Sequence, residues 1–191
     1  MKLGDKKQVL ISFHYRPWEL YNNDNSFASS EYLSGVNEFL NSREIKNLAK
    51  ELKVVFIPHA RYKKYISWFE VPSYISVQSE EQFQDVFVQS DFLITDFSST
   101  SFEFAYMDKP TFVFIPDLDC VKNNMPQYHI ENIKNYPHLI WCDTIKDAVN
   151  GIRGYCRKSE SEFKVSNKMF DHHDTNNTSR MLDWMFQQYG I

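Results

Sequence analysis

Four consecutive hydroxyl residues follow a short apolar run near the middle of the 191-residue chain. After the run Phe92–Thr95 and the pair Asp96-Phe97 come Ser98, Ser99, Thr100 and Ser101. The run has the character of a buried strand, and Thr100–Met107 is expected to form the next helix. Hydroxyls at a helix start can cap its unpaired amides, and the same amides can instead hold a phosphate. Capping by Ser98 or Ser99 needs one hydroxyl, so four in a row favour an anion pocket.

A histidine and an arginine are expected near this turn. His59 follows the strand-like run Val54–Ile57, so it should lie at the carboxyl edge of the sheet. There it could donate to a phosphate oxygen or act as an acid–base group near neutral pH; the alternative is a loop histidine without a special role. Arg16 follows Val9–Phe13, and its forked guanidinium suits contact with a phosphate.

One further polar cluster suggests a metal site, but its spacing argues against it. Residues 171–174 read Asp-His-His-Asp. Adjacent side chains diverge, whereas metal sites usually gather carboxylate and histidine ligands from separate elements. We therefore predict no metal and no cofactor.

The elements that must position these residues alternate between two patterns. Strand-like runs are Val9–Phe13, Val54–Ile57, Tyr74–Val77, Phe92–Thr95, Thr111–Ile115 and Leu139–Trp141. Helical spacing of apolar residues occurs at 32–40, 45–52, 80–90 and 145–152, and again at Met181–Met185. This alternation predicts one α/β domain over residues 1–191, with a Rossmann-like, doubly wound parallel sheet. Its ligand should lie beyond the carboxyl ends of the strands, where the strand order reverses.

Composition excludes several classes of protein. The formal net charge of −4 provides no basic field for nucleic acid. Three cysteines without paired metal-type spacing indicate a reducing compartment, and no run approaches the roughly 20 apolar residues that cross a bilayer. The start of the chain lacks the pattern of a signal peptide. We therefore expect a cytoplasmic protein.

The segment around the hydroxyl turn resembles a known family. Residues 91–99 read Asp-Phe-Leu-Ile-Thr-Asp-Phe-Ser-Ser, followed by Phe-Glu-Phe at 102–104 and Asp-Lys-Pro at 108–110. This combination is similar to the signature of CDP-glycerol glycerophosphotransferases, the teichoic-acid and capsule polymerases. In that family an aspartate-aromatic-Ser-Ser turn precedes a helix and then a Lys-Pro strand. Residues 13–18 and 170–180 also resemble family motifs, so the resemblance covers most of the chain.

The resemblance implies the two-lobed GT-B fold, of which this chain would be the C-terminal nucleotide-binding lobe, with the acceptor lobe absent. It implies CDP-glycerol or a related CDP-polyol as donor and a polymer or lipid-linked acceptor. His59 would be the active-site histidine, and Asp96 would belong to the donor-binding turn. Asp174 would face the glycerol phosphate or the ribose. Any peripheral attachment to the inner face of the cell membrane would come from a missing N-terminal region.

Two other functions remain open at this stage. The same fold serves sugar-nucleotide glycosyltransferases. A non-catalytic nucleotide-binding or interaction domain is the second alternative, and the departure of residues 122–136 from the family pattern favours it. By itself the chain is expected to be an incomplete enzyme.

Overall fold

The centre of the protein is a parallel sheet that places three strand ends together. The computed structural model describes residues 6–20, 24–126, 130–157, 170–172 and 174–190, and within them six strands form one sheet. The strands are β1 (Gln8–Ile11), β2 (Lys53–Phe56), β3 (Ser76–Val77), β4 (Phe92–Thr95), β5 (Thr111–Val113) and β6 (Leu139–Trp141). Their order is β3-β2-β1-β4-β5-β6, and every neighbouring pair is parallel. The predicted doubly wound parallel sheet is confirmed, and its order reverses between β1 and β4.

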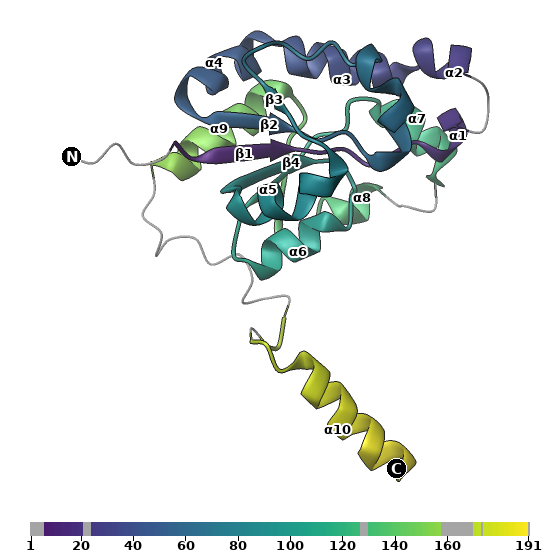
Figure 1. Cartoon of the computed structure of the whole chain (residues 1–191), viewed down its shortest axis with the longest axis vertical. Helices are drawn as coiled ribbons and strands as arrows, with labels where there is room; N and C mark the ends of the chain where they lie inside the picture. The colour runs from purple at the N-terminus through teal and green to yellow at the C-terminus, as the bar shows by residue number, and fades with distance from the viewer. Residues whose placement is uncertain (1–5, 21–23, 127–129, 158–169, 173, 191) are drawn as a thin grey trace.

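Helices cover both faces of the sheet because successive strand residues point to opposite sides. Val9 and Ile11 of β1 pack against apolar residues of α3 (Glu31–Asn41), α4 (Arg43–Glu51) and α9 (Ile145–Cys156). Leu10 points the other way, toward α5 (Phe83–Gln89) and α6 (Thr100–Tyr106). Figure 1 shows α3 and α4 on one side of the sheet and α5 and α6 on the other. The shorter helices are α1 (Pro17–Leu20), α2 (Asp24–Ala28), α7 (Leu118–Asn124) and α8 (Ile130–Ile133), with the 3-10 helices η1 (Ala60–Trp68) and η2 (Glu80–Gln82).

Several helix starts follow from local capping chemistry. The side chain of Ser30 accepts a hydrogen bond from the backbone N–H of Leu33 at the start of α3. Thr144 and Asp147 form a reciprocal capping box at the start of α9. These side chains satisfy amides that no helical carbonyl reaches, so short polar residues set the point where each helix begins.

The structure corrects some predicted boundaries. The helix expected over residues 80–90 is divided into η2 and α5, because Ser79 and Gln82 form a capping box around a 3-10 turn. Residues 60–68, to which the sequence assigned no element, form η1. This helix buries Tyr62 and Tyr65 and leaves the basic side chains of the segment exposed. The strands β4 and β6 have the predicted limits.

The last helix, α10 (Asn177–Tyr189), extends away from the sheet (Figure 1). None of its residues is buried, and its apolar side chains Met181, Leu182, Trp184, Met185, Phe186 and Tyr189 are exposed. The segment before it contacts α6, where the hydroxyl of Tyr106 donates to the carbonyl oxygen of Asp174 at 2.6 Å. Among the described residues, no helix is both long enough and apolar enough to cross a membrane.

Two glycines of α9 test how closely this helix packs on the sheet. A Cβ at Gly151 would overlap the buried ring of Phe112, whereas a Cβ at Gly154 would meet no atom within 4 Å. Gly151→Ala should therefore lower the free energy of unfolding by about 1–3 kcal/mol through overpacking. Gly154→Ala, its control in the same helix, should raise it by about 0.5–1 kcal/mol. Urea titration would measure both, and equal stabilisation by the two alanines would contradict this packing.

Candidate functional site

A cavity of about 390 Å³ lies where the strand order reverses. It is lined by residues 12–14 after β1, 57–60 after β2 and 98–100 after β4, with Glu80, Phe83 and Gln84 from η2 and α5. Because the strands are parallel, their carboxyl ends meet at one edge of the sheet and bring these three segments together. The structure thus places His59 beside the hydroxyl turn, in agreement with the prediction of its position.

The hydroxyl turn lines the cavity and makes one long side-chain contact at the start of α6. Ser99 occupies the N-cap position, but its side chain makes no capping hydrogen bond within the described structure. The side chain of Ser98 accepts from the hydroxyl of Thr100 at 2.9 Å and from its backbone N–H at 3.5 Å. Ser101 is buried and does not line the cavity. Three of the four predicted hydroxyl residues therefore line the cavity.

Two histidines face the same cavity, and the sequence analysis assigned a role to only one of them. The rings of His14 and His59 have centroids 5.5 Å apart. His59 caps η1, where its Nδ1 accepts the backbone N–H of Arg61 at 3.2 Å. Burial lowers the pKa of His59, and the neighbouring His14 lowers it further. The place of His14 just after β1, at the same sheet edge, is the signal that could have identified it.

Arg16 lies beneath the cavity and not on its surface. Its side chain is fully buried and donates from Nε to Asp117 at 2.8 Å and from Nη1 to Asp96 at 2.7 Å. Nη1 also donates to the carbonyl oxygen of His14 at 2.8 Å, and Nη2 pairs with Asp117. Burial by itself would lower the pKa of Arg16, but the two carboxylates raise it, so the guanidinium stays charged.

These contacts show which partners Arg16 and Asp96 have within the protein. The guanidinium is buried against carboxylates and does not line the cavity, so its predicted contact with a phosphate stays a prediction. Asp96 is equally buried, and its two carboxylate oxygens accept the backbone N–H of His14 at 3.0 and 3.1 Å. The resemblance assigned Asp96 to the donor-binding turn, and in the structure its carboxylate holds His14 and Arg16 beside that turn.

Asp174 does not line this cavity, and its expected contact with the donor stays a prediction. Arg180 of α10 donates to both of its carboxylate oxygens, at 2.9 and 3.1 Å. This pairing, together with the backbone N–H of Asn176, lowers the pKa of Asp174 to about 2. The carboxylate thus organises the start of α10.

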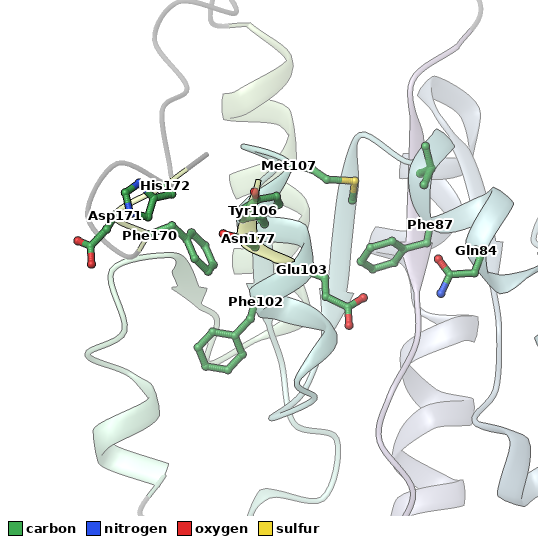
Figure 2. A pocket seen from close by; sticks show the side chains of 11 residues that line it. Gln84, Phe87, Phe102, Glu103, Tyr106, Met107, Phe170, Asp171, His172 and Asn177 are labelled. Carbon is green, nitrogen blue, oxygen red and sulfur yellow. The ribbon is translucent and has the colours of Figure 1, made fainter. Parts of the chain in front are cut away.

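A second cavity of about 620 Å³ lies on the outer side of α6. Figure 2 shows Gln84 and Phe87 of α5 on one side of it, Phe102, Glu103 and Tyr106 of α6 in the middle, and Phe170, Asp171 and His172 on the other side. Gln84 also lines the first cavity, so the two are neighbours along α6. His173 of the predicted polar cluster lies outside the described residues. No group of three potential metal ligands converges in the described parts of the chain.

Comparison with known proteins identifies the family. A family model described as CDP-Glycerol:Poly(glycerophosphate) glycerophosphotransferase matches residues 3–187. The chain belongs to this family. Its relatives include the minor teichoic acid biosynthesis protein GgaB of Bacillus subtilis (strain 168), which is 35% identical over 91 residues, 46% of this chain and 10% of that protein. The teichoic acid poly(glycerol phosphate) polymerase of Bacillus spizizenii is 26% identical over 159 residues, 81% of this chain and 39% of its own length.

Solved structures share the fold of this family member. The wall teichoic acid polymerase TagF superimposes with a TM-score of 0.60 at 17% identity, over 97% of this chain and 44% of that one. The co-structure of S. aureus MnaA with UDP gives a TM-score of 0.55 at 16% identity, over 97% of this chain and 46% of that one. The Rossmann-like lobe expected from the sequence is confirmed. The chain spans less than half the length of these relatives.

The buried charge cluster gives a test of what supports the cavity. Asp117→Asn preserves the shape of the side chain but leaves Arg16 without the carboxylate that binds it at two nitrogens. Breaking a buried pair in this way should lower the free energy of unfolding by about 3–5 kcal/mol. The exposed pair between Arg153 and Glu51, at 2.6 Å, provides the control. Glu51→Gln should cost less than about 1 kcal/mol. If chemical denaturation shows equal losses of unfolding free energy for the two variants, the buried ion pair stabilises the fold no more than the exposed pair does.

Proposed function

We propose that the cavity between the ends of β1, β2 and β4 binds the pyrophosphate of a CDP-linked polyol, with CDP-glycerol as the donor. The enzyme would transfer glycerol phosphate, or a similar polyol phosphate, to a hydroxyl of a teichoic-acid-like or capsular polymer. The observation that carries this proposal is the convergence of two histidines and four hydroxyl residues, Ser12 and three of the hydroxyl turn, at the switch point of the sheet in a chain of this family.

The relatives support the choice of donor. The protein from Bacillus spizizenii is described as a poly(glycerol phosphate) polymerase. A solved variant of TagF was soaked with CDPG and has the same fold as this chain, with a TM-score of 0.55 at 16% identity. These descriptions concern those proteins. They favour a cytidine donor over a uridine donor for this chain.

The proposed reaction needs little covalent chemistry from the protein. The acceptor hydroxyl would attack the β-phosphorus of the donor, its oxygen would bond to phosphorus, and the bond from the β-phosphorus to the bridging oxygen would break as CMP leaves. The hydroxyl proton would pass to the phosphate of the leaving CMP or to solvent. Positioning and stabilisation of negative charge would supply most of the acceleration. Ser98, Ser99 and Thr100 would bind phosphate oxygens through their hydroxyls. His59 would donate a hydrogen bond to the charge that develops there.

The second cavity offers a place for the cytidine half of the donor. It adjoins the first cavity at Gln84, and its lining is largely apolar, which suits a ribose and a base. Glu103 lies on α6 one turn beyond the hydroxyl residues, and its carboxylate could accept hydrogen bonds from the ribose hydroxyls. In this arrangement the donor runs along α6, with the pyrophosphate at the start of the helix.

Partners and location follow from the same proposal. The polymerase relative is more than twice as long as the part that this chain matches, so we assign acceptor binding to residues outside these 191. Any attachment to the inner face of the membrane would belong to that part as well. The three cysteines are free thiols, which agrees with a cytoplasmic reaction.

Calorimetric titration of the chain with nucleotides tests the donor assignment. CDP-glycerol and CMP should bind at millimolar concentration or below, whereas UDP and UDP-glucose should bind more weakly. Such a difference would mean that the pocket distinguishes cytosine from uracil, since both classes of ligand carry phosphates. Binding of a uridine ligand without any cytidine ligand would point instead to a sugar-nucleotide transferase. Absence of binding by all four would favour an interaction domain.

Removing hydroxyls tests where the pyrophosphate lies. The double change Ser98→Ala and Ser99→Ala should weaken CDP-glycerol binding by about 1–3 kcal/mol, the usual loss for hydrogen bonds to a charged group. Thr144→Ala is the matched control, because it removes a capping hydroxyl from α9, away from the cavity. It should lower stability by about 1 kcal/mol and leave donor affinity unchanged. A folded double mutant with full affinity would show that these serines do not contact the donor.

A further inference from the structure

The first cavity contains no side chain that is always positively charged. Its described lining includes no lysine or arginine, and Arg16 beneath it is committed to Asp96 and Asp117. One carboxylate, that of Glu80, is part of the lining. A pyrophosphate that joins two ester groups carries two negative charges, which neutral hydroxyls alone satisfy poorly. The imidazoles of His14 and His59 are the groups in this lining that could supply a positive charge.

The backbone decides which ring nitrogen of each histidine carries a proton. The carbonyl oxygen of Tyr15 lies 2.7 Å from Nδ1 of His14, and a carbonyl only accepts, so this nitrogen carries a proton. In His59 the situation is opposite. Its Nδ1 accepts the backbone N–H of Arg61 at 3.2 Å, so it has a lone pair and the ring is neutral, with its proton on Nε2.

The two rings therefore respond differently to acid. His14 can take a second proton on Nε2 without losing its hydrogen bond to Tyr15. His59 can become a cation only by protonating Nδ1, which would break its hydrogen bond with Arg61. Burial and then the charge of His14 lower the pKa of His59, which agrees with a neutral ring. The geometry thus leaves Nε2 of His14 as the position where a second proton breaks no hydrogen bond with the backbone.

Other groups packed around His14 keep a constant charge near neutral pH. Asp96 accepts its backbone N–H, and Arg16 donates to its carbonyl oxygen. Its ring contacts those of Tyr15 and Phe97 as well as His59. The guanidinium of Arg61 lies 5.7 Å from the ring centre of Tyr15, and Glu80 lines the cavity. Carboxylates, guanidinium groups and tyrosines ordinarily titrate outside pH 6–8, so a change of affinity over this range reports on histidine.

We propose that His14 is a second donor-binding residue, which pairs with the pyrophosphate as an imidazolium while His59 binds it as a neutral N–H donor. The proposal rests on the proposed function, because its ligand is the same pyrophosphate. Binding would then take up a proton at His14, and the complex would hold more protons than the free protein. Linkage requires that affinity rises as the pH falls.

CDP-glycerol is a suitable probe because both of its phosphates are esterified on two sides, whereas the terminal phosphate of CMP titrates near pH 6. Isothermal titration at constant ionic strength should show roughly tenfold tighter binding at pH 6 than at pH 8, the effect of a one-unit shift at one group. Titration in buffers of different ionisation enthalpy should show net proton uptake at intermediate pH.

Two matched variants separate the histidines. His14→Asn keeps an amide donor for the carbonyl of Tyr15 but removes Nε2, so the difference between pH 6 and pH 8 and the proton uptake should disappear. His59→Asn keeps an oxygen acceptor for the N–H of Arg61. It should weaken binding at both pH values and retain the tenfold ratio. A pH-independent wild type, or a pH dependence that persists in His14→Asn and vanishes in His59→Asn, would overturn the proposal.

Nitrogen NMR of the unliganded wild type tests the same assignment without a donor or a variant. The shifts should show a protonated Nδ1 in His14 and an unprotonated Nδ1 in His59 at pH 7.5; the reverse pattern would refute the proposal. If CDP-glycerol does not bind at either pH, the proposed donor is wrong. The same pH series with UDP-glucose, another pyrophosphate diester, then decides whether the role of His14 stands.

Discussion

The buried charge of Arg16 is the constraint on which the edge of the sheet depends. Its guanidinium joins the segments that follow β1, β4 and β5, because it binds Asp96 and Asp117 from two directions. The backbone N–H of Arg16 also donates to the hydroxyl of Tyr62 in η1 at 2.8 Å. Taking three charges out of water is costly, and the cost is offset only while each keeps its hydrogen bonds. The loops around the cavity are therefore held to one arrangement.

The same cluster of charged residues connects the lining of the first cavity to the core. Asp96 accepts from Arg16 below and from the backbone of His14 above, so one carboxylate positions both. The ring of Tyr32 lies 4.6 Å from the guanidinium carbon on one side, and that of Phe97 lies 5.0 Å from it. The charge of Arg16 is thus kept in the interior, where it holds loops. The cavity lining combines hydroxyls and imidazoles with apolar side chains and the carboxylate of Glu80.

Helix α6 links the two cavities of the protein. Thr100 at its start and Ser98 and Ser99 just before it line one cavity, and its outer side carries Phe102, Glu103 and Tyr106 of the other. The buried residues Phe104 and Ala105 fix the helix to the sheet. A nucleotide donor would meet both cavities along one rigid element.

Local sequence patterns determined much of this protein by themselves. Apolar runs of the length of a strand predicted the limits of β4 and β6, and the alternation of strands with helices predicted a parallel sheet. The hydroxyl turn and His59 were recognisable because both directly follow strands. These features depend on neighbours within a few residues, which periodicity and capping describe well.

Tertiary structure alone decided the roles of the charged residues. Arg16 looked like a phosphate contact, but its partners Asp96 and Asp117 stand 80 and 101 positions away in the sequence. Asp174 pairs with Arg180 beside α10, a partner that the sequence pattern did not indicate. His14 lies beside His59 because β1 and β2, which precede them, pair in parallel register. A charged side chain binds whichever partner the fold brings within a few ångströms, and no local pattern records that distance.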